Sequence, residues 1–221
     1  MKTNNKRRQF LVAGLGLFGT SLALSLQDLG YEVIGLDNDE AIIQEISSRL
    51  TYAVCGDASD RRALEQLAIE DVDVAVVAIG NVETNMMCVM LLKEMGVPMV
   101  VGKATSDIHG AMLTKIGADK VVFPEKDMGK RMAYNLVSGA IMDYIELSKE
   151  ISIMNLELPE ELVGVSLIDA GLRRRFDVNV VAIRREGKII VNPKAQEVFK
   201  RGDEVIVLGT HAGVRKMGVE F

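Results

Sequence analysis

The stretch Gly14-Leu15-Gly16-Leu17-Phe18-Gly19 decides the fold of this chain. It follows an apolar run and leads directly into a helical pattern that begins Thr20-Ser21-Leu22. A GxGxxG sequence between a strand and a helix is typical of nucleotide-binding α/β domains. We expect Gly14 to allow the tight turn, Gly16 to let the backbone approach a phosphate, and Gly19 to let helix and strand pack closely.

An acidic residue follows at the expected distance. Asp37 ends the next apolar run, 18 residues past Gly19, close to the about 20 that separate this motif from a ribose-binding carboxylate. A carboxylate there repels a 2′-phosphate, which favours NAD or an adenine nucleotide over NADP. The glycines could instead serve packing alone. The strand, the helix and Asp37 stand in the right order, however, and this favours a nucleotide site whose phosphates meet the first N–H groups of the helix.

The first 124 residues alternate short apolar runs with helical patterns. Runs of consecutive apolar residues, such as 74–79, suit parallel strands that are covered on both faces. The predicted strands are 9–14, 32–37, 52–55, 73–79, 99–103 and 120–123, and the predicted helices are 18–29, 39–49, 60–68, 83–95 and 106–116. This order predicts a doubly wound parallel α/β sheet for residues 1–124.

Polar residues follow several of these strands at the sheet edge where ligands bind. They belong to Gly56-Asp57-Ala58-Ser59 and Gly80-Asn81, and Lys103 ends the fifth strand. Asp57 could cap the helix at 60–68 or face an adenine. Lys103 could form a salt bridge or bind a phosphate.

The pattern changes after Pro124. Residues 125–149 are predicted to form one crossover helix, and 11 of the 16 positions in 132–147 are apolar. A helix that is apolar on most sides needs cover on more than one of them, so we expect a second subunit there. Residues 150–221 are predicted to form a small α+β domain with strands at 151–158, 179–184, 188–192 and 203–208, helices at 166–176 and 211–217, and a hairpin turn at Glu186-Gly187.

Composition excludes several classes of protein. The 221 residues carry a formal net charge of −5, which disfavours a nucleic-acid partner. Two cysteines, Cys55 and Cys88, are too few for a disulfide framework or a zinc site, and we expect both to be buried thiols in a reducing cytoplasm. His109 is expected on a surface or interface. The apolar runs are too short to span a bilayer, so we expect a cytoplasmic protein.

Several motifs together resemble one known family. They are GLGLFG, GDASD, VVAIG, KATSDIHGAMLTKIGADKVVFPEKDMGKRMA and the late RGDEVIVLG. These stretches cover nearly the whole chain and are similar to the RCK (KTN) regulatory proteins, the Ktr/TrkA-type subunits of bacterial potassium uptake systems. The resemblance implies a Rossmann-like RCK N-lobe, a crossover helix and an RCK C-terminal domain. It also implies a homodimer that assembles into an octameric ring on the inner face of the cell membrane, beneath an embedded potassium transporter.

The resemblance further implies ligands and site residues. ATP, ADP or NAD(H) would bind at Gly14, Gly16, Leu17, Phe18, Gly19, Asp37, Asn38, Asp39, Asp57, Ala58, Ala78, Ile79, Gly80, Lys103 and Glu125. Glu125 would also bind Mg²⁺ or Ca²⁺. Cyclic di-AMP would bind in the C-terminal domain at Leu167, Ile168, Arg173, Arg174, Asn179, Val180 and Pro193, a segment that also includes Asp169.

One residue departs from the family pattern. Many Ktr-type proteins have GxGRFG, with an arginine directed at the terminal phosphates, where this chain has Leu17. Losing this charge-assisted contact makes NAD, ADP or AMP more competitive with ATP. An NAD-dependent dehydrogenase is the rival interpretation, but the second half offers only His211 as a histidine and no clear acid–base pair. The sequence therefore predicts a regulator that is not an enzyme.

Overall fold

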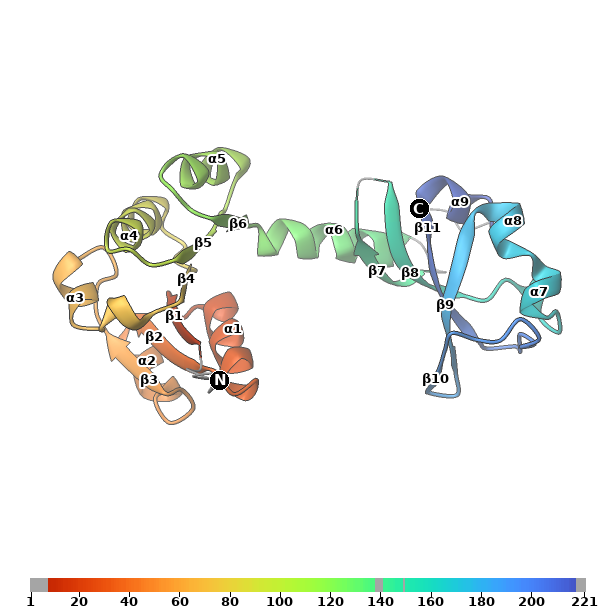
Figure 1. Cartoon of the computed structure of the whole chain (residues 1–221), viewed down its shortest axis with the longest axis horizontal. Coiled ribbons are helices and arrows are strands. Elements are labelled where there is room, and N and C mark those ends of the chain that lie inside the picture. Colours follow the sequence, from red (N-terminus) through yellow and green to blue (C-terminus); the bar gives the residue numbers. More distant parts are fainter. Residues whose placement is uncertain (1–7, 138–140, 149, 218–221) are drawn as a thin grey trace, which may run out of the picture. The chain divides into compact units, whose positions relative to one another are not determined.

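The computed structural model describes residues 8–137, 141–148 and 150–217. The chain divides into two compact units, Met1–Glu125 and Lys126–Phe221. Each unit has its own sheet and its own hydrophobic core (Figure 1).

The first unit is built on a six-stranded parallel sheet in the order β3-β2-β1-β4-β5-β6. Its strands are β1 (Gln9–Ala13), β2 (Glu32–Asp37), β3 (Tyr52–Cys55), β4 (Val74–Val77), β5 (Met99–Lys103) and β6 (Lys120–Val122). Its helices are α1 (Leu17–Asp28), α2 (Glu40–Ile46), α3 (Arg61–Glu65), α4 (Val82–Glu94) and α5 (Asp107–Lys115), with a short 3-10 turn at Ile69–Asp71. The predicted doubly wound sheet is confirmed, and its strand order reverses between β1 and β4.

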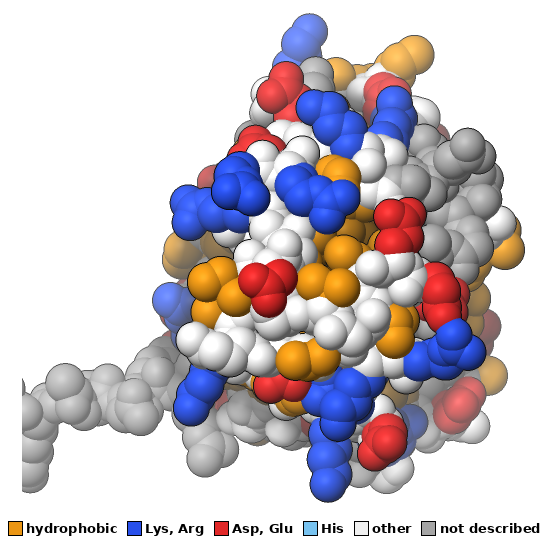
Figure 2. All heavy atoms as spheres, turned by 90° about the vertical axis from the view of Figure 1, so that its right-hand side faces the viewer, with side chains coloured by type: hydrophobic (Ala, Val, Ile, Leu, Met, Phe, Trp, Pro, Cys, Tyr) orange, Lys and Arg blue, Asp and Glu red, His pale blue; other side chains and the backbone are white. Residues whose placement is uncertain are grey.

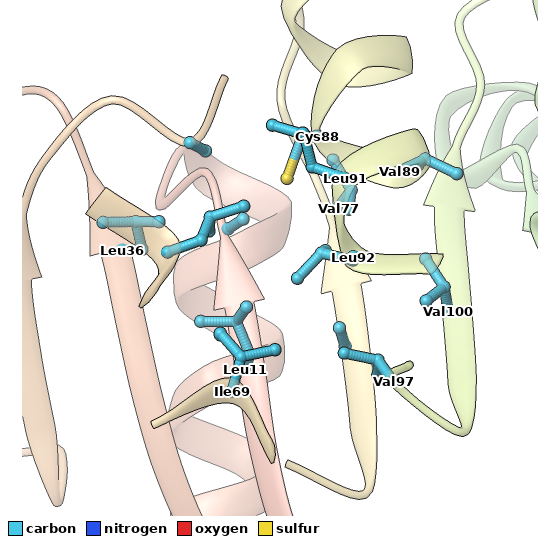
Figure 3. Close-up of a cluster of buried hydrophobic side chains, with 14 of the residues drawn as sticks. Leu11, Leu36, Ile69, Val77, Cys88, Val89, Leu91, Leu92, Val97 and Val100 are labelled. Atoms are coloured by element: carbon cyan, nitrogen blue, oxygen red, sulfur yellow. The ribbon is translucent and has the colours of Figure 1, made fainter. Parts of the chain in front are cut away.

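Alternate residues of the central strands belong to different cores, which explains their continuous apolar sequences. On β1, Leu11 packs in the core that includes Leu92 of α4, whereas Val12 packs in the core that includes Ala23 of α1. Figure 3 shows Leu91 and Leu92 of α4 directed toward the strands that carry Leu11 and Val77. Burying each such leucine stabilises the fold by roughly 1.5–3 kcal/mol.

The second unit holds a five-stranded antiparallel sheet in the order β10-β9-β11-β8-β7. Its strands are β7 (Ile141–Glu146), β8 (Ile151–Glu157), β9 (Val178–Arg185), β10 (Lys188–Val191) and β11 (Glu204–Thr210). Its helices are α7 (Leu167–Ala170), α8 (Leu172–Phe176) and α9 (His211–Arg215), with a 3-10 turn at Glu160–Leu162. The predicted hairpin is confirmed: Glu186 and Gly187 join β9 to β10 with φ values of +48° and +75°.

Two predicted helices of this half are wrong in part. The crossover helix 125–149 is shorter than predicted, because α6 (Pro124–Val137) ends before β7 begins. The apolar residues of 141–146 form an edge strand that pairs with β8, as Ile145 does with Ile153. β-branched and aromatic residues favour that outcome. The helix predicted at 166–176 is split into α7 and α8 by Gly171, whose φ of +54° no α-helix accommodates.

The lengths of the helices also bear on membrane insertion. Within the part of the chain that the structure describes, no helix is both long and apolar enough to cross a bilayer.

Candidate nucleotide site

The three motif glycines meet three different steric demands. Gly14 has a φ of +91°, and a Cβ there would lie 2.8 Å from the backbone nitrogen of Ile79. A Cβ on Gly19 would lie 1.8 Å from the carbonyl oxygen of Gly14, so only glycine lets α1 pack this closely. Gly16 has no atom within 4 Å of an added Cβ. The open space at Gly16 is what a phosphate approaching the backbone requires.

Among helices α1 to α5, α1 is the one whose N-terminus lacks a side-chain cap. The starts of α2, α3, α4 and α5 are capped by Asp39, Asp60, Asn81 and Ser106. The α1 N-cap is Gly16, with no side-chain hydrogen bond and no acidic residue in the first turn. The first N–H groups of a helix need acceptors and carry partial positive charge. This helix start therefore suits a bound anion.

Asp37 holds the glycine loop in place at the end of β2. Its Oδ2 accepts a hydrogen bond from the backbone N–H of Leu15 at 2.6 Å, and its Oδ1 accepts one from the N–H of Asp39 at 3.0 Å. A carboxylate has about four acceptor positions, so capacity remains for ribose hydroxyls. The glycine loop and the carboxylate thus form one connected structure.

A cavity of about 330 Å³ lies at the carboxyl ends of the parallel strands, beside the strand-order reversal. Its lining residues are Gly14, Gly16, Leu36, Asp37, Asn38, Gly56, Asp57, Ala58, Ala78, Ile79, Gly80, Thr84 and Lys103. Ten of these were predicted from the sequence. Leu36, Gly56 and Thr84 were missed, although Gly56 stands in the quoted strand-end motif and Leu36 directly precedes Asp37. Thr84 lies in the first turn of α4, where no predicted site residue adjoins it. Open α/β sheets bind ligands at this position.

Five predicted residues do not line the cavity. They are Leu17, Phe18, Gly19, Asp39 and Glu125. Leu17 is 96% exposed to solvent, and the carboxylate of Asp39 caps α2 by accepting the N–H of Ala41. Gly19 is a packing residue, as shown above. Glu125 forms a salt bridge with Lys103, which does line the cavity.

The structure bears on two alternatives that the sequence left open, and the ligand contacts of both residues stay predictions. Asp57 does not cap the following helix, because Asp60 does. Asp57 instead accepts hydrogen bonds from the hydroxyl and the N–H of Ser59, which lower the pKa of its carboxyl. Lys103, of which only 12% is exposed, does form a salt bridge: its Nζ lies 3.0 Å from Oε1 of Glu125. The hydrogen bond from Lys103 holds the pKa of Glu125 below its usual value.

Two expectations about single residues are wrong. Cys88 is buried as expected, and burial raises the pKa of its thiol to about 12, but Cys55 is exposed at the end of β3. His109 is 2% exposed rather than on the surface. Its Nδ1 accepts the N–H of Thr105 at 3.3 Å, and burial lowers its pKa. Both residues stand at the ends of elements, where a local pattern does not determine exposure.

A second cavity, of about 380 Å³, lies in the second unit. Its lining residues are Leu167, Ile168, Gly171, Leu172, Arg173, Arg174, Val178, Asn179 and Val180. Six of the seven residues predicted to bind cyclic di-AMP lie there, whereas Pro193 does not. Figure 2 shows a face of this unit where hydrophobic side chains gather in the middle and Lys and Arg side chains lie around them.

Metal ligands are sparse in the described part of the chain. None of its residues form a group of three or more His, Cys, Asp or Glu that could hold a metal ion. Glu125 alone would supply one carboxylate, so a cation there needs further ligands from a nucleotide or a second chain.

The fold and the first cavity define a class: a Rossmann-type nucleotide-binding domain followed by a small antiparallel α+β domain. Comparison with protein families identifies both parts, since residues 10–124 match the TrkA-N domain and residues 153–221 match the TrkA-C domain. The chain belongs to the Ktr/Trk family of potassium uptake proteins, as the sequence motifs indicated.

Individual relatives agree along nearly their full length. The chain is 40% identical over 205 residues to Ktr system potassium uptake protein C of Bacillus subtilis, covering 92% of this chain and 93% of the relative. It is 34% identical over 212 residues to Ktr system potassium uptake protein A of the same organism, covering 96% of each.

A solved structure supports the fold. The GsuK channel bound to NAD matches with a TM-score of 0.68 at 15% identity, covering 97% of this chain and 39% of the channel chain.

Proposed function

We propose that this chain is the nucleotide-sensing regulatory subunit of a potassium uptake system, acting in the cytoplasm at the inner face of the membrane beside an embedded transporter. The observation that carries the proposal is the uncapped N-terminus of α1 beside the cavity that Asp37 and the open Gly16 line. The relatives named for Ktr potassium uptake support the transport context. The likeness to a channel structure containing NAD supports a nucleotide ligand.

Regulation fits this cavity better than catalysis. None of the described residues that line it is a histidine. Both lining carboxylates already accept hydrogen bonds, Asp37 from Leu15 and Asp57 from Ser59. Hydride transfer would require a positioned acid or base beside the substrate. A turnover assay with NADH and simple carbonyl compounds should therefore show no oxidation above background.

Assembly through α6 is the second part of the proposal. Met128, Met132 and Leu136 recur every four residues on this helix, and they are 55%, 51% and 77% exposed. Residues four apart lie on one helix face, so these side chains form an exposed apolar row. Such a row supports pairing of α6 between two copies, and we propose that the dimers build the octameric ring that the family resemblance implies.

Divalent cations would act at the start of α6. In a dimer paired through α6, two copies of Glu125 would repel each other unless a cation lay between them. Mg²⁺ and Ca²⁺ accept carboxylate and phosphate oxygens together. We therefore propose Glu125 as a ligand for a cation that responds to the bound nucleotide, in competition with its salt bridge to Lys103.

The second cavity supports a second ligand. It combines the guanidinium groups of Arg173 and Arg174 with the apolar Leu167 and Val180 and the amide of Asn179. Arginines suit phosphates, and apolar side chains suit purine faces. We propose that cyclic di-AMP binds here.

Identification of the co-purified nucleotide tests the main proposal. Protein purified without added nucleotide, then denatured, should release an adenine nucleotide or NAD(H) detectable by mass spectrometry. Gly16→Val should release almost none, because a Cβ at this position meets no protein atom within 4 Å and the valine side chain would fill the space that a phosphate needs. Gly129→Val, at an α6 position that is also open and does not line the cavity, controls for changes in glycine content. Equal release from the wild type and Gly16→Val would contradict the proposed site.

A further inference from the structure

We propose that Arg185 shapes the second cavity from outside it, as a positioning residue. Arg185 is the last residue of β9 and does not line the cavity. It acts through residues 192–203, the connecting segment that joins β10 to β11. The inference rests on the proposed binding of cyclic di-AMP in this cavity, and it adds a residue on which the shape of that site depends.

The connecting segment holds one wall of the cavity through backbone hydrogen bonds. Leu167 and Ile168 line the cavity and are the first two residues of α7, so their N–H groups have no acceptor within their own helix. The N–H of Leu167 donates to the carbonyl oxygen of Glu197 at 2.8 Å, and the N–H of Ile168 donates to that of Ala195 at 2.9 Å. The position of this wall therefore depends on the connecting segment.

Arg185 fixes the connecting segment through three of its residues. Its Nε and Nη2 donate to the two carboxylate oxygens of Asp203, and its Nη1 donates to Oε1 of Glu197, all at 2.8 Å. Its Nη2 also donates to the carbonyl oxygen of Val198 at 2.9 Å. Glu197 therefore connects the two sets of contacts, because its carboxylate binds Arg185 and its carbonyl oxygen holds the cavity wall.

The hydrogen bonds of Arg185 supply an orientation that apolar packing of the same segment does not. Phe199 anchors the segment in the core that includes the lining residue Leu172, and its side chain is 1% exposed. Such packing is non-directional, so it does not orient the carbonyl groups that hold the wall. The planar fork of Arg185 contacts three residues at once and does orient them. A wall that is already ordered reduces the entropy cost of binding and so strengthens it.

Isothermal titration of the full chain with cyclic di-AMP tests the inference. Arg185→Lys keeps a positive charge beside Asp203, which supports folding, but a single nitrogen cannot contact all three residues of the segment. We expect about tenfold weaker binding of cyclic di-AMP, the effect of one lost charge-assisted hydrogen bond. Arg184→Lys is the matched control. Arg184 pairs with Glu204 on the opposite face of the sheet, so this variant should keep the wild-type affinity.

Two further measurements separate positioning from a purely structural role. In ligand-free protein, hydrogen exchange at the two wall amides should be faster in Arg185→Lys than in the wild type, and unchanged in Arg184→Lys. Glu197→Ala removes the carboxylate but keeps the backbone carbonyl group, so it should weaken cyclic di-AMP binding in the same direction. Combining it with Arg185→Lys should weaken binding less than the two separate losses together, because both variants disrupt the same contact.

The possible results separate the inference from the proposed function. Unchanged affinity in Arg185→Lys overturns the inference and leaves the cavity as a ligand site, whether or not amide exchange becomes faster. An equal loss of affinity in Arg184→Lys also overturns it, because the effect would then not depend on the connecting segment. If Arg185→Lys does not fold, Glu197→Ala decides, and wild-type affinity in that variant overturns the inference. Wild-type protein that binds no cyclic di-AMP overturns the proposed second ligand and the inference together.

Discussion

Asp37 combines structural and binding roles in a single carboxylate. Its Oδ2 accepts the N–H of Leu15 within the glycine loop, while the remaining lone pairs are available to a ribose. Asp37→Ala should weaken adenine-nucleotide affinity by about 1.5–3 kcal/mol, since it removes a charged acceptor and releases the loop. Asp37→Asn can still accept from Leu15, so it should lose less. Calorimetric titration measures both affinities, and unchanged binding in both variants would remove Asp37 from the site.

The sequence predicted the site residues whose roles follow from the local order of strand, turn and helix. It did not predict roles that depend on side chains brought close by the fold. The positions of Gly14, Gly16 and Asp37 follow from a strand, a turn and a helix in order. Whether Asp57 or Asp60 caps α3 depends on one turn of backbone, and a pattern does not distinguish them. The salt bridge between Lys103 and Glu125 joins residues that are 22 apart in the sequence, so a local sequence pattern cannot predict that these two residues pair.

At the scale of elements, Asn85 of α4 connects the ends of two strands under the cavity. Its side chain is fully buried, and its Nδ2 donates to the carbonyl oxygens of Ile79 at 2.9 Å, Lys103 at 3.3 Å and Val77 at 3.4 Å. Asn85→Ala leaves these carbonyls without their donor and should lower the free energy of unfolding by about 1–3 kcal/mol. Asn85→Asp replaces the donor with a carboxylate and should cost more. Urea denaturation followed by circular dichroism compares the variants, and a stability equal to the wild type would show that the contacts are dispensable.

The α6 helix was predicted from the sequence only in part. Its start at Pro124 and its need for apolar cover were predicted, but residues 141–146 were assigned to the same helix. Residues 141–146 instead form β7, because they pair with β8, which follows later in the chain. Pairing of this kind between strands overrides the helical periodicity of the local sequence. The exposed row of Met128, Met132 and Leu136 on α6 is the observation on which the proposed pairing rests.

Leu136→Glu tests that partner. Because Leu136 is 77% exposed in the single chain, the variant should fold normally while placing a charge in the proposed α6 contact. Multi-angle light scattering should show smaller particles than the wild type. Ile189→Glu, at a side chain on β10 that is 54% exposed, serves as the matched control. A Leu136→Glu particle as large as the wild type would contradict pairing through α6.

At the scale of the whole molecule, the two units depend on different interactions. The first has continuous apolar strands, whereas the second is held in part by a buried ion pair. Arg185 donates to Asp203 and Glu197 at 2.8 Å, and the Asp203 side chain has no solvent exposure. Asp203 also accepts the N–H of Lys200. Burial is the largest single influence and would raise the pKa of Asp203. The hydrogen bonds from Arg185 and from the backbone of Lys200, together with the positive charges of both residues, outweigh it, so the pKa lies below its usual value.

This pair should make the second unit sensitive to acid. A carboxyl whose pKa is lowered by folding stabilises the folded state above its unfolded pKa, which is about 4, and the contribution disappears as the pH falls through the folded value. Asp203→Asn should cost about 2–4 kcal/mol at neutral pH, because it removes the fully buried carboxylate partner of Arg185 and leaves Glu197 as the remaining carboxylate of the pair. Thermal unfolding between pH 3 and pH 7 should show a smaller pH dependence in the variant. Parallel curves for the two proteins would mean that the pair contributes nothing to acid sensitivity.

At the end of the first unit, one ion pair connects the proposed nucleotide cavity to the start of α6. Lys103 lines the nucleotide cavity, and its partner Glu125 is the second residue of α6, the helix proposed to pair between copies. A phosphate that competes for Lys103 would release Glu125 to bind a cation at the dimer contact. A bound ligand shifts a conformational equilibrium only as far as its affinities for the two states differ. In the proposed mechanism, the exchange of partners at Lys103 and Glu125 would provide that difference in affinity.

Glu125→Gln keeps the size of the side chain and removes its charge, so it separates cation binding from simple helix-start electrostatics. In wild-type protein with nucleotide bound, titration with Mg²⁺ or Ca²⁺ should change nucleotide affinity or particle dimensions, and in Glu125→Gln that response should vanish. Asp127→Asn, two residues further into α6, controls for the loss of a negative charge near the helix start, where such charges are worth about 0.3–1 kcal/mol. Superimposable titrations of wild type and Glu125→Gln would leave Glu125 as a partner of Lys103 with no part in cation binding.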